Sequence, residues 1–146
     1  MSEPFDLKQK AQKLDKLLNG GVLIRILGNS ARNFFVQSWR NQGFTDNELV
    51  KWKHRKADEM NPKTKAYKQS QGRAIGIKTG DLRRSVRILR AGRQYVEVGS
   101  DLDYAEYFNG GVPSRNQVAR PFVGASNTLD AIMLKEIDVA IMNILG

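Results

Sequence analysis

The sequence has no cysteine and only one histidine. Without cysteine the chain can form no disulfide, no zinc site built on thiolates and no cysteine nucleophile, so several classes of enzyme are excluded. Long apolar runs are also missing, because no stretch approaches the roughly 18 residues that a membrane span requires. The first residues, MSEPFDLKQK, lack the basic-then-apolar pattern of a secretory signal. We therefore expect a soluble protein that is made in a cytoplasm and has no membrane partner.

Acidic residues are scarce in the middle of the chain, although the whole chain has a formal net charge of +9. Residues 51–93 contain fourteen basic and three acidic residues, whereas residues 94–146 contain three basic and seven acidic residues. This asymmetry indicates either a basic surface for an anionic partner, nucleic acid or an acidic protein, or a solvated lysine-rich loop. With 146 residues, 40% of them hydrophobic, the chain fits a single domain over residues 1–146.

Apolar residues at helical spacing predict two N-terminal helices, over about residues 5–18 and 22–40, separated by Asn19-Gly20-Gly21. From about residue 44 to residue 77 the periodicity fails. We expect a long basic loop there, with Trp52 holding its first part against the body and the rest ordered only on assembly.

The second half of the chain shows strand and turn signals. Period-two alternation predicts an antiparallel hairpin over about residues 82–99, with Val96 and Val98 inside. A short helix is expected over about residues 103–109, capped by Asp103. Pro121 favours a brief strand over residues 120–123, and an apolar stripe predicts a C-terminal helix over about residues 127–145. These elements predict an α+β fold in which the N-terminal and C-terminal helices pack on one face of a small antiparallel sheet.

Residues suited to catalysis or metal binding are few. His54 lies in the basic stretch KWKHRK without a carboxylate at helical spacing, which is typical of a solvated loop histidine. Asp101, Asp103 and Glu106 are close enough in sequence to bind a divalent cation, but no glycine-centred calcium loop follows them. We expect no enzyme activity, no metal and no cofactor, and we rank a hydrolase that uses these three carboxylates last.

Arginines are concentrated around the predicted hairpin. Arginine on a sheet can contact phosphates, yet only Tyr95 is near enough to stack on a base, and no sequence-reading motif is present. We expect at most nonspecific contact with DNA. The candidate residues for contact with an anion or DNA are Arg83, Arg84, Arg87, Arg90 and Arg93.

Five short motifs follow one another along the chain: FFVQSWRNQGF, WKHRK, TGDLRRSV, VEVGSDLDYAEYFNGG and ARPFVGASNTLDAI. In this order they resemble the phage virion morphogenesis family, the tail-completion or head–tail joining proteins similar to the G protein of phage Mu. The match covers roughly residues 30 to 145. The family often carries histidine where this chain has Phe108, so no role of that histidine is transferred.

The resemblance implies a non-enzymatic phage or prophage protein. It implies a location in the virion, and in the bacterial host cytoplasm during assembly. It also implies a homo-oligomeric ring that contacts other phage tail or connector proteins. A ring is built from contacts between two different patches, and the basic middle and acidic C-terminal third suit such contacts. The alternative hypothesis is a nucleic-acid-binding module that uses the basic region over residues 51–93.

The sequence also predicts a surface for assembly and a set of residues that anchor the fold. The segment between the short helix and the last strand is weakly charged and glycine-rich, which favours an exposed surface for a neighbouring subunit. The candidate assembly surface consists of Tyr104, Tyr107, Phe108, Val112, Arg115 and Asn116. The expected structural anchors are Trp39, Trp52, Gly80, Leu82, Pro121, Phe122, Gly124 and Ser126.

Overall fold

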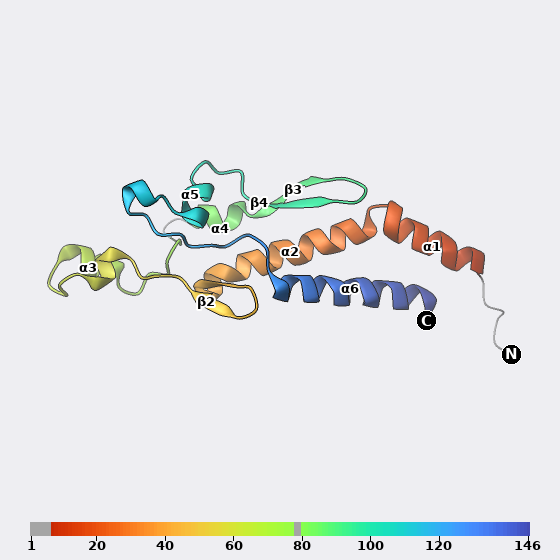
Figure 1. Cartoon of the computed structure of the whole chain (residues 1–146), viewed down its shortest axis with the longest axis horizontal. Coiled ribbons are helices and arrows are strands. Elements are labelled where there is room, and N and C mark those ends of the chain that lie inside the picture. The colour runs from red at the N-terminus through yellow and green to blue at the C-terminus, as the bar shows by residue number, and fades with distance from the viewer. Residues whose placement is uncertain (1–6, 78–79) are drawn as a thin grey trace.

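The computed structural model describes residues 7–77 and 80–146 and has the α+β architecture that the sequence predicts (Figure 1). Within the described residues, helices dominate, and the strands form two separate two-stranded antiparallel sheets, β1–β2 and β3–β4. The helices are α1 (Leu7–Asn19), α2 (Val22–Asn41), α3 (Lys65–Ser70), α4 (Asp81–Ser85), α5 (Ala105–Gly110) and α6 (Asn127–Leu145). The strands are β1 (Gly43–Thr45), β2 (Leu49–Lys51), β3 (Arg87–Ala91) and β4 (Val96–Gly99), and two short 3-10 helices are η1 (Lys56–Glu59) and η2 (Pro113–Arg115).

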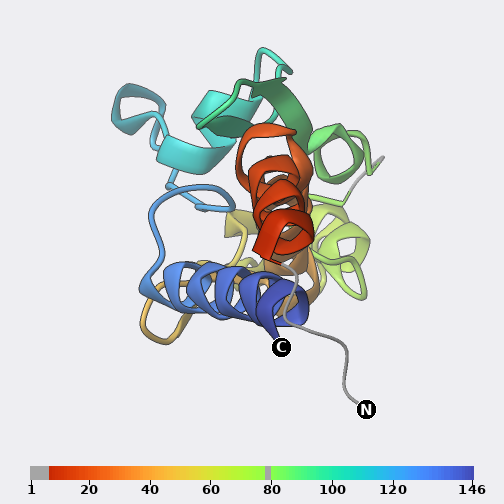
Figure 2. The same cartoon turned by 90° about the vertical axis from the view of Figure 1, so that its right-hand side faces the viewer.

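Helix α2 is the centre of the molecule. The β3–β4 hairpin packs along one side of it and α6 along the other, while α1 packs against both long helices (Figure 2). Gly28 allows the hairpin to approach α2 closely, because a Cβ atom there would lie only 2.7 Å from Cδ1 of Ile88. The predicted start of the first helix at residue 5 lies outside the described residues. None of the helices among the described residues is long and apolar enough to cross a membrane.

The predicted hairpin over residues 82–99 is wrong at its start, because Asp81–Ser85 forms helix α4. Gly80 precedes this helix with φ of 77°, a left-handed conformation that favours glycine, and the Ser85 hydroxyl donates to the Leu82 carbonyl at 2.6 Å. Strand β4 alternates as expected, because Val96 and Val98 are half-buried whereas Glu97 is exposed. Strand β3 does not alternate: only Ile88 is half-buried, and the pairing with β4 shifts between Ile88 and Arg90.

The long loop predicted over residues 44–77 is also wrong, because this segment contains β1, β2, η1 and α3. Its β1–β2 turn supports the start of α6. The Thr128 amide donates to the Asp46 carbonyl at 3.0 Å, and the Asn127 amide donates to the Asp46 carboxylate at 2.8 Å. These bonds join residues more than eighty positions apart, so no local sequence pattern reveals them.

Residues 120–123 form no strand. The amides of Phe122 and Val123 both donate to Oδ1 of Asn109, at 2.9 and 3.1 Å, so a side chain satisfies the backbone groups that a neighbouring strand would otherwise bind. Helix α5 begins after Tyr104, and no side chain caps it, so the expected capping role of Asp103 is wrong. Helix α6 matches its prediction, and Ser126 caps it by accepting from the Leu129 amide at 3.1 Å.

An aromatic cluster forms the core. The rings of Trp39 and Phe122 lie 4.7 Å apart, and Trp52 and Phe108 pack against them at 5.4 Å from one another. Trp39 and Phe122 are each 1% exposed, so both are anchors of the fold. Leu82 and Ser126 are buried too, while the Pro121 carbonyl accepts from the Trp52 indole at 2.7 Å. Gly124, with φ of 151°, forms the turn that leads to the Ser126 cap.

Candidate assembly and anion-binding surfaces

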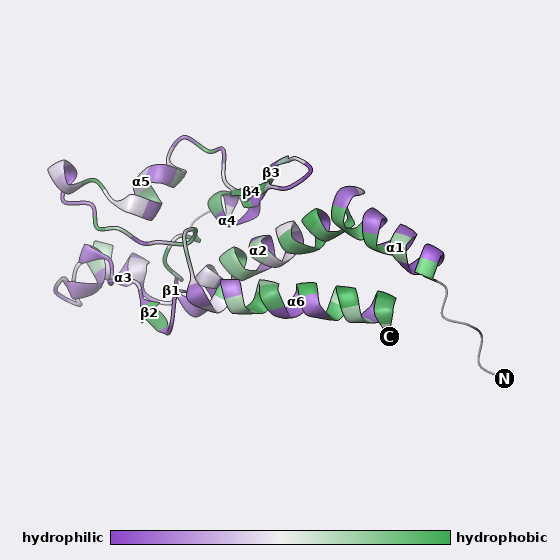
Figure 3. Cartoon of the chain, turned by 45° about the vertical axis from the view of Figure 1, so that its right-hand side comes forward, coloured by the Kyte–Doolittle hydropathy of each residue, from purple (hydrophilic) through white to green (hydrophobic). Residues whose placement is uncertain are grey.

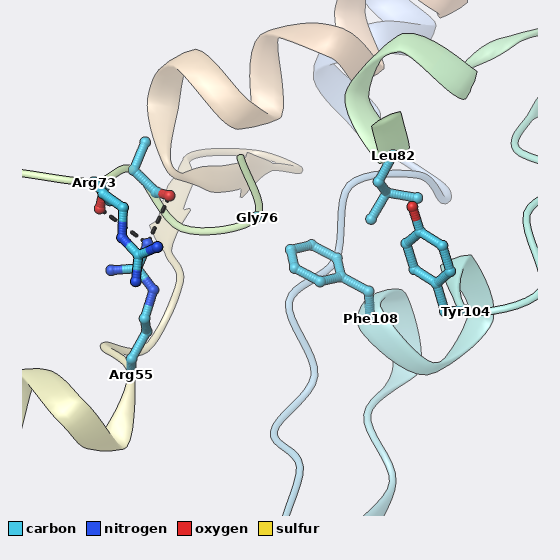
Figure 4. Close-up of a pocket in the computed structure, with 7 residues that line it drawn as sticks. Arg55, Arg73, Gly76, Leu82, Tyr104 and Phe108 are labelled. Carbon is cyan, nitrogen blue, oxygen red and sulfur yellow. Dashed lines mark hydrogen bonds between the residues drawn. The ribbon is translucent and has the colours of Figure 1, made fainter. Parts of the chain in front are cut away.

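Residues 53–73, called the basic arm below, project from the body and contain η1 and α3 (Figure 1). The side chain of Arg55 links the start of the arm to its end, an arrangement called the closed arm below. It donates to the carbonyls of Arg73 and Ala74, at 2.9 and 2.6 Å (Figure 4). It also donates to the Ser70 carbonyl at 3.4 Å. A guanidinium presents five donors in a fixed plane, which suits several carbonyls at once. One arginine therefore joins the two ends of an irregular segment.

Asp58 lies beside Arg55 within the arm. Its carboxylate accepts from the Arg55 amide at 3.1 Å and lies 3.6 Å from the Arg55 guanidinium. The Ser70 hydroxyl, the Arg55 amide and the Arg55 charge together hold the pKa of Asp58 below its usual value of 3.8. The carboxylate is therefore the form that stabilises the closed arm.

The base of the arm is tied to the chain that follows α5. The guanidinium of Arg120 donates to the carbonyls of Lys53 and His54, both at 3.1 Å. Burial, and then the nearby charge of Arg55, lower the pKa of Arg120 from its usual value, but an arginine stays charged at neutral pH. Sequence reasoning missed both Arg55 and Arg120, because their partners are backbone carbonyls of distant residues.

The lysines of the arm remain in solvent. All five of them are exposed, and none forms an ion pair with any of the described residues. Only two acidic residues, Asp58 and Glu59, lie in the arm, and Asp58 is engaged by Arg55. The exposed lysines are Lys53, Lys56, Lys63, Lys65 and Lys68.

Unlike the arm lysines, most of the arginines around the hairpin form ion pairs. Three of the five arginines predicted to contact an anion have carboxylate partners. Arg84 pairs with Asp81 at 2.7 Å, Arg87 with Asp101 at 2.5 Å, and Arg90 with Glu97 at 3.3 Å. The other two candidates are Arg83, which is half-buried, and Arg93, which is exposed. Much of the charge that the sequence places on the hairpin is therefore locally neutralised.

An open pocket of about 260 Å³ lies between the arm and α5 (Figure 4). Leu82, Tyr104 and Phe108 form one side of it, and Arg55 and Arg73 form the other. The Arg55 guanidinium in this wall is already bound to carbonyls. The pocket therefore joins an apolar wall to a cationic one, and no histidine or carboxylate is among its lining residues.

The residues considered for catalysis are dispersed. Asp101 pairs with Arg87, Asp103 and Glu106 are exposed, and His54 lies at the base of the arm. Among residues 7–77 and 80–146, no group of three or more histidine or acidic side chains is placed to hold a metal ion.

The candidate assembly surface is divided by the structure. Tyr104 and Tyr107 are 48% and 49% exposed, whereas Phe108 turns inward and stacks on Trp39 with ring centres 6.3 Å apart. The loop beyond α5 is closed, because the amides and carbonyls of Val112 and Gln117 bond to each other at 2.9 and 3.1 Å. Arg115 and Asn116 are exposed at its tip.

Helix α6 provides a larger apolar surface, which sequence reasoning did not assign. Twelve of its nineteen residues are apolar, yet only Leu129 is buried. Figure 3 shows hydrophobic colour along most of the visible side of the helix, interrupted by short hydrophilic patches. The large side chains left in solvent are Ile132, Leu134, Val139, Met142 and Leu145, which are 39% to 63% exposed. The signal was present in the sequence, because an amphipathic surface helix has one polar face and this helix has almost none.

Comparison with known proteins does not assign the chain to a family. No family model matches the chain, and no curated protein and no solved structure is significantly similar to it.

Proposed function

We propose that this chain is a non-enzymatic structural subunit of a phage or prophage virion that acts in tail completion or head–tail joining and assembles into a ring. The observation that carries the proposal is the exposed apolar surface of α6. A helix that is apolar on nearly all sides is normally buried, and large apolar patches on soluble proteins mark contact surfaces. Half-exposed side chains such as Leu134 and Met142 are therefore suited to contact another subunit.

The motifs that resemble the virion morphogenesis family support the same proposal. Residues from these motifs meet in the core, where Trp39, Trp52, Phe108 and Phe122 pack together. Ser126, from the last motif, caps α6 and donates to the Thr45 carbonyl at 2.7 Å. Residues that hold a fold in place are what a structural subunit requires.

The first test is the size and shape of the purified protein. We expect sedimentation analysis to detect an oligomer, and negative-stain electron microscopy to show closed rings. A protein that stays monomeric at high concentration, and that also fails to bind purified tail or connector proteins, would contradict the proposal.

A double substitution, Leu134→Glu with Met142→Glu, tests the α6 surface. Glutamate forms helices nearly as well as leucine and methionine, so the helix itself is retained. Loss of two apolar contacts and burial of two charges weaken association by about 3 kcal/mol or more, roughly 100-fold. The matched control, Gln12→Glu with Gln37→Glu, adds two negative charges at exposed sites on α1 and α2 and keeps the oligomer. Equal behaviour of the two variants would exclude α6 as the contact surface.

A further inference from the structure

The basic arm has the largest uncompensated charge in the described part of the chain. It carries seven lysines and arginines against two acidic residues, and five of its lysines are exposed without an ion pair among the described residues. We infer that the arm binds the phosphate backbone of double-stranded DNA without reading its sequence. This binding goes beyond the proposed structural role, because it requires neither a ring nor another virion protein.

The arm presents its charges from a closed structure. Arg55 and Arg120 bind its carbonyls, and Thr64 begins α3 by accepting from the Tyr67 amide at 3.3 Å. Lys65 and Lys68 lie three residues apart in this helix and so share one face. The lysines are therefore already positioned, and little of the backbone has to be ordered on binding.

The chemistry of the exposed residues favours DNA over an acidic protein. Protein interfaces gain most of their stability from apolar and aromatic anchors and are depleted in lysine. Met60 is the one large hydrophobic side chain of the arm that is exposed. Contacts between lysine and phosphate need no such anchor, because the release of counterions drives the binding.

The same residues favour a duplex over a single strand and exclude sequence readout. Single strands are bound by stacking their bases on exposed aromatic rings. The only aromatic side chains in the arm are His54, which is exposed but binds Arg120 through its carbonyl, and Tyr67, which is half-buried. Lysine contacts to phosphates set position but carry no sequence information.

The ion pairs of the structure favour the arm lysines over the hairpin arginines as the DNA contact. Arg84, Arg87 and Arg90 already have carboxylate partners, which partly neutralise the charge that would attract a phosphate there. The arm lysines have no such competitor among the described residues.

The test is a salt titration of binding to a fluorescent DNA duplex of about 20 base pairs. If the five lysines each neutralise one phosphate, log K falls against log salt with a slope of about −4.5. Affinity then drops about 500-fold between about 50 and 200 mM salt. Failure to bind the duplex at low salt would overturn the inference.

The triple variant Lys63→Gln, Lys65→Gln and Lys68→Gln locates the contact. We expect the salt slope to become less steep by about 2.7, because three phosphate contacts are removed. The matched control is Lys8→Gln, Lys13→Gln and Lys16→Gln, which removes the same charge from exposed positions on α1. An equal change in both variants would show that overall charge, not the arm, determines binding, and would overturn the inference.

Two further readouts separate the alternatives. Polyglutamate at an equal concentration of charge should not displace the duplex, and full displacement would assign the arm to an acidic protein instead. The oligomeric state of the triple variant should equal that of the unmodified chain. If the triple variant keeps its oligomeric state but no longer binds the duplex, the result supports DNA binding by the arm. If the unmodified chain binds the duplex but forms no ring, the result contradicts only the proposed structural role.

Discussion

At the scale of single residues, Asn109 replaces a strand partner. Its Oδ1 atom accepts from the amides of Phe122 and Val123, and so holds the extended segment that returns the chain to the core. Phe122 is 1% exposed and packs on Trp39. The position of this core ring therefore depends on a side chain thirteen residues earlier in the sequence.

We expect Asn109→Ala to lower the free energy of unfolding by about 3 kcal/mol, because two half-buried amides lose their acceptor. Asn109→Asp keeps an acceptor oxygen at the same place and should cost less than about 1 kcal/mol. Urea denaturation followed by tryptophan fluorescence measures both. If alanine and aspartate proved equally destabilising, the two amide bonds would not be the cause.

At the scale of elements, the basic arm depends on Asp58 in its ionised form. Because the pKa of Asp58 is lower in the folded protein than its usual value of 3.8, its contribution to stability is fully present above about pH 3.8. The contribution is lost as the pH falls through the lowered folded value. We therefore expect the contacts of Asp58 within the arm to weaken only in acid.

An NMR titration from about pH 6 to pH 2 measures this change. We expect the Asp58 carboxyl signal to titrate with a midpoint below 3.8, and the Arg55 amide, which donates to Asp58, to shift with the same midpoint. Asp58→Asn removes the shared titration from the Arg55 amide. An Arg55 amide that shifts identically in this variant would show that another group is responsible.

Local signals predicted some elements well and others not at all. The C-terminal helix and its Ser126 cap were predicted because a cap and a long apolar pattern lie within one continuous segment. Helix α4 was missed because it has only five residues and leads directly into a strand. The order within the basic arm was missed because Arg55 binds carbonyls fifteen to nineteen residues away.

The sequence likewise predicted the candidate surfaces only in part. Charge counting found the basic middle of the chain but assigned the anion contact to hairpin arginines. The partner of Arg87 is Asp101, fourteen residues later, and only the hairpin brings the two together. For the same reason the sequence could show that α6 is apolar but not which of its side chains stay exposed. Pairing and burial are properties of the folded chain.

At the scale of the whole molecule, the two proposed surfaces lie on different parts of an elongated chain. Helix α3 of the arm lies at one end, and the C-terminal half of α6 extends toward the other (Figure 1). Effects of substitutions at distant sites without shared partners normally add. Assembly through α6 and DNA binding through the arm should therefore be separable, although an oligomer presents several arms to the same duplex.

The variant Leu134→Glu with Met142→Glu tests this separation on duplexes of two lengths. A duplex of about 15 base pairs accommodates one arm, so its affinity should match that of the charge control, Gln12→Glu with Gln37→Glu. A duplex of about 150 base pairs can engage several arms, and linked sites raise the overall affinity by about 10²- to 10⁴-fold. The α6 variant should lose this gain while its salt slope on the short duplex stays unchanged. A fall in affinity for the short duplex as well would mean that α6 helps to form the DNA-binding surface, because avidity cannot act where only one arm binds.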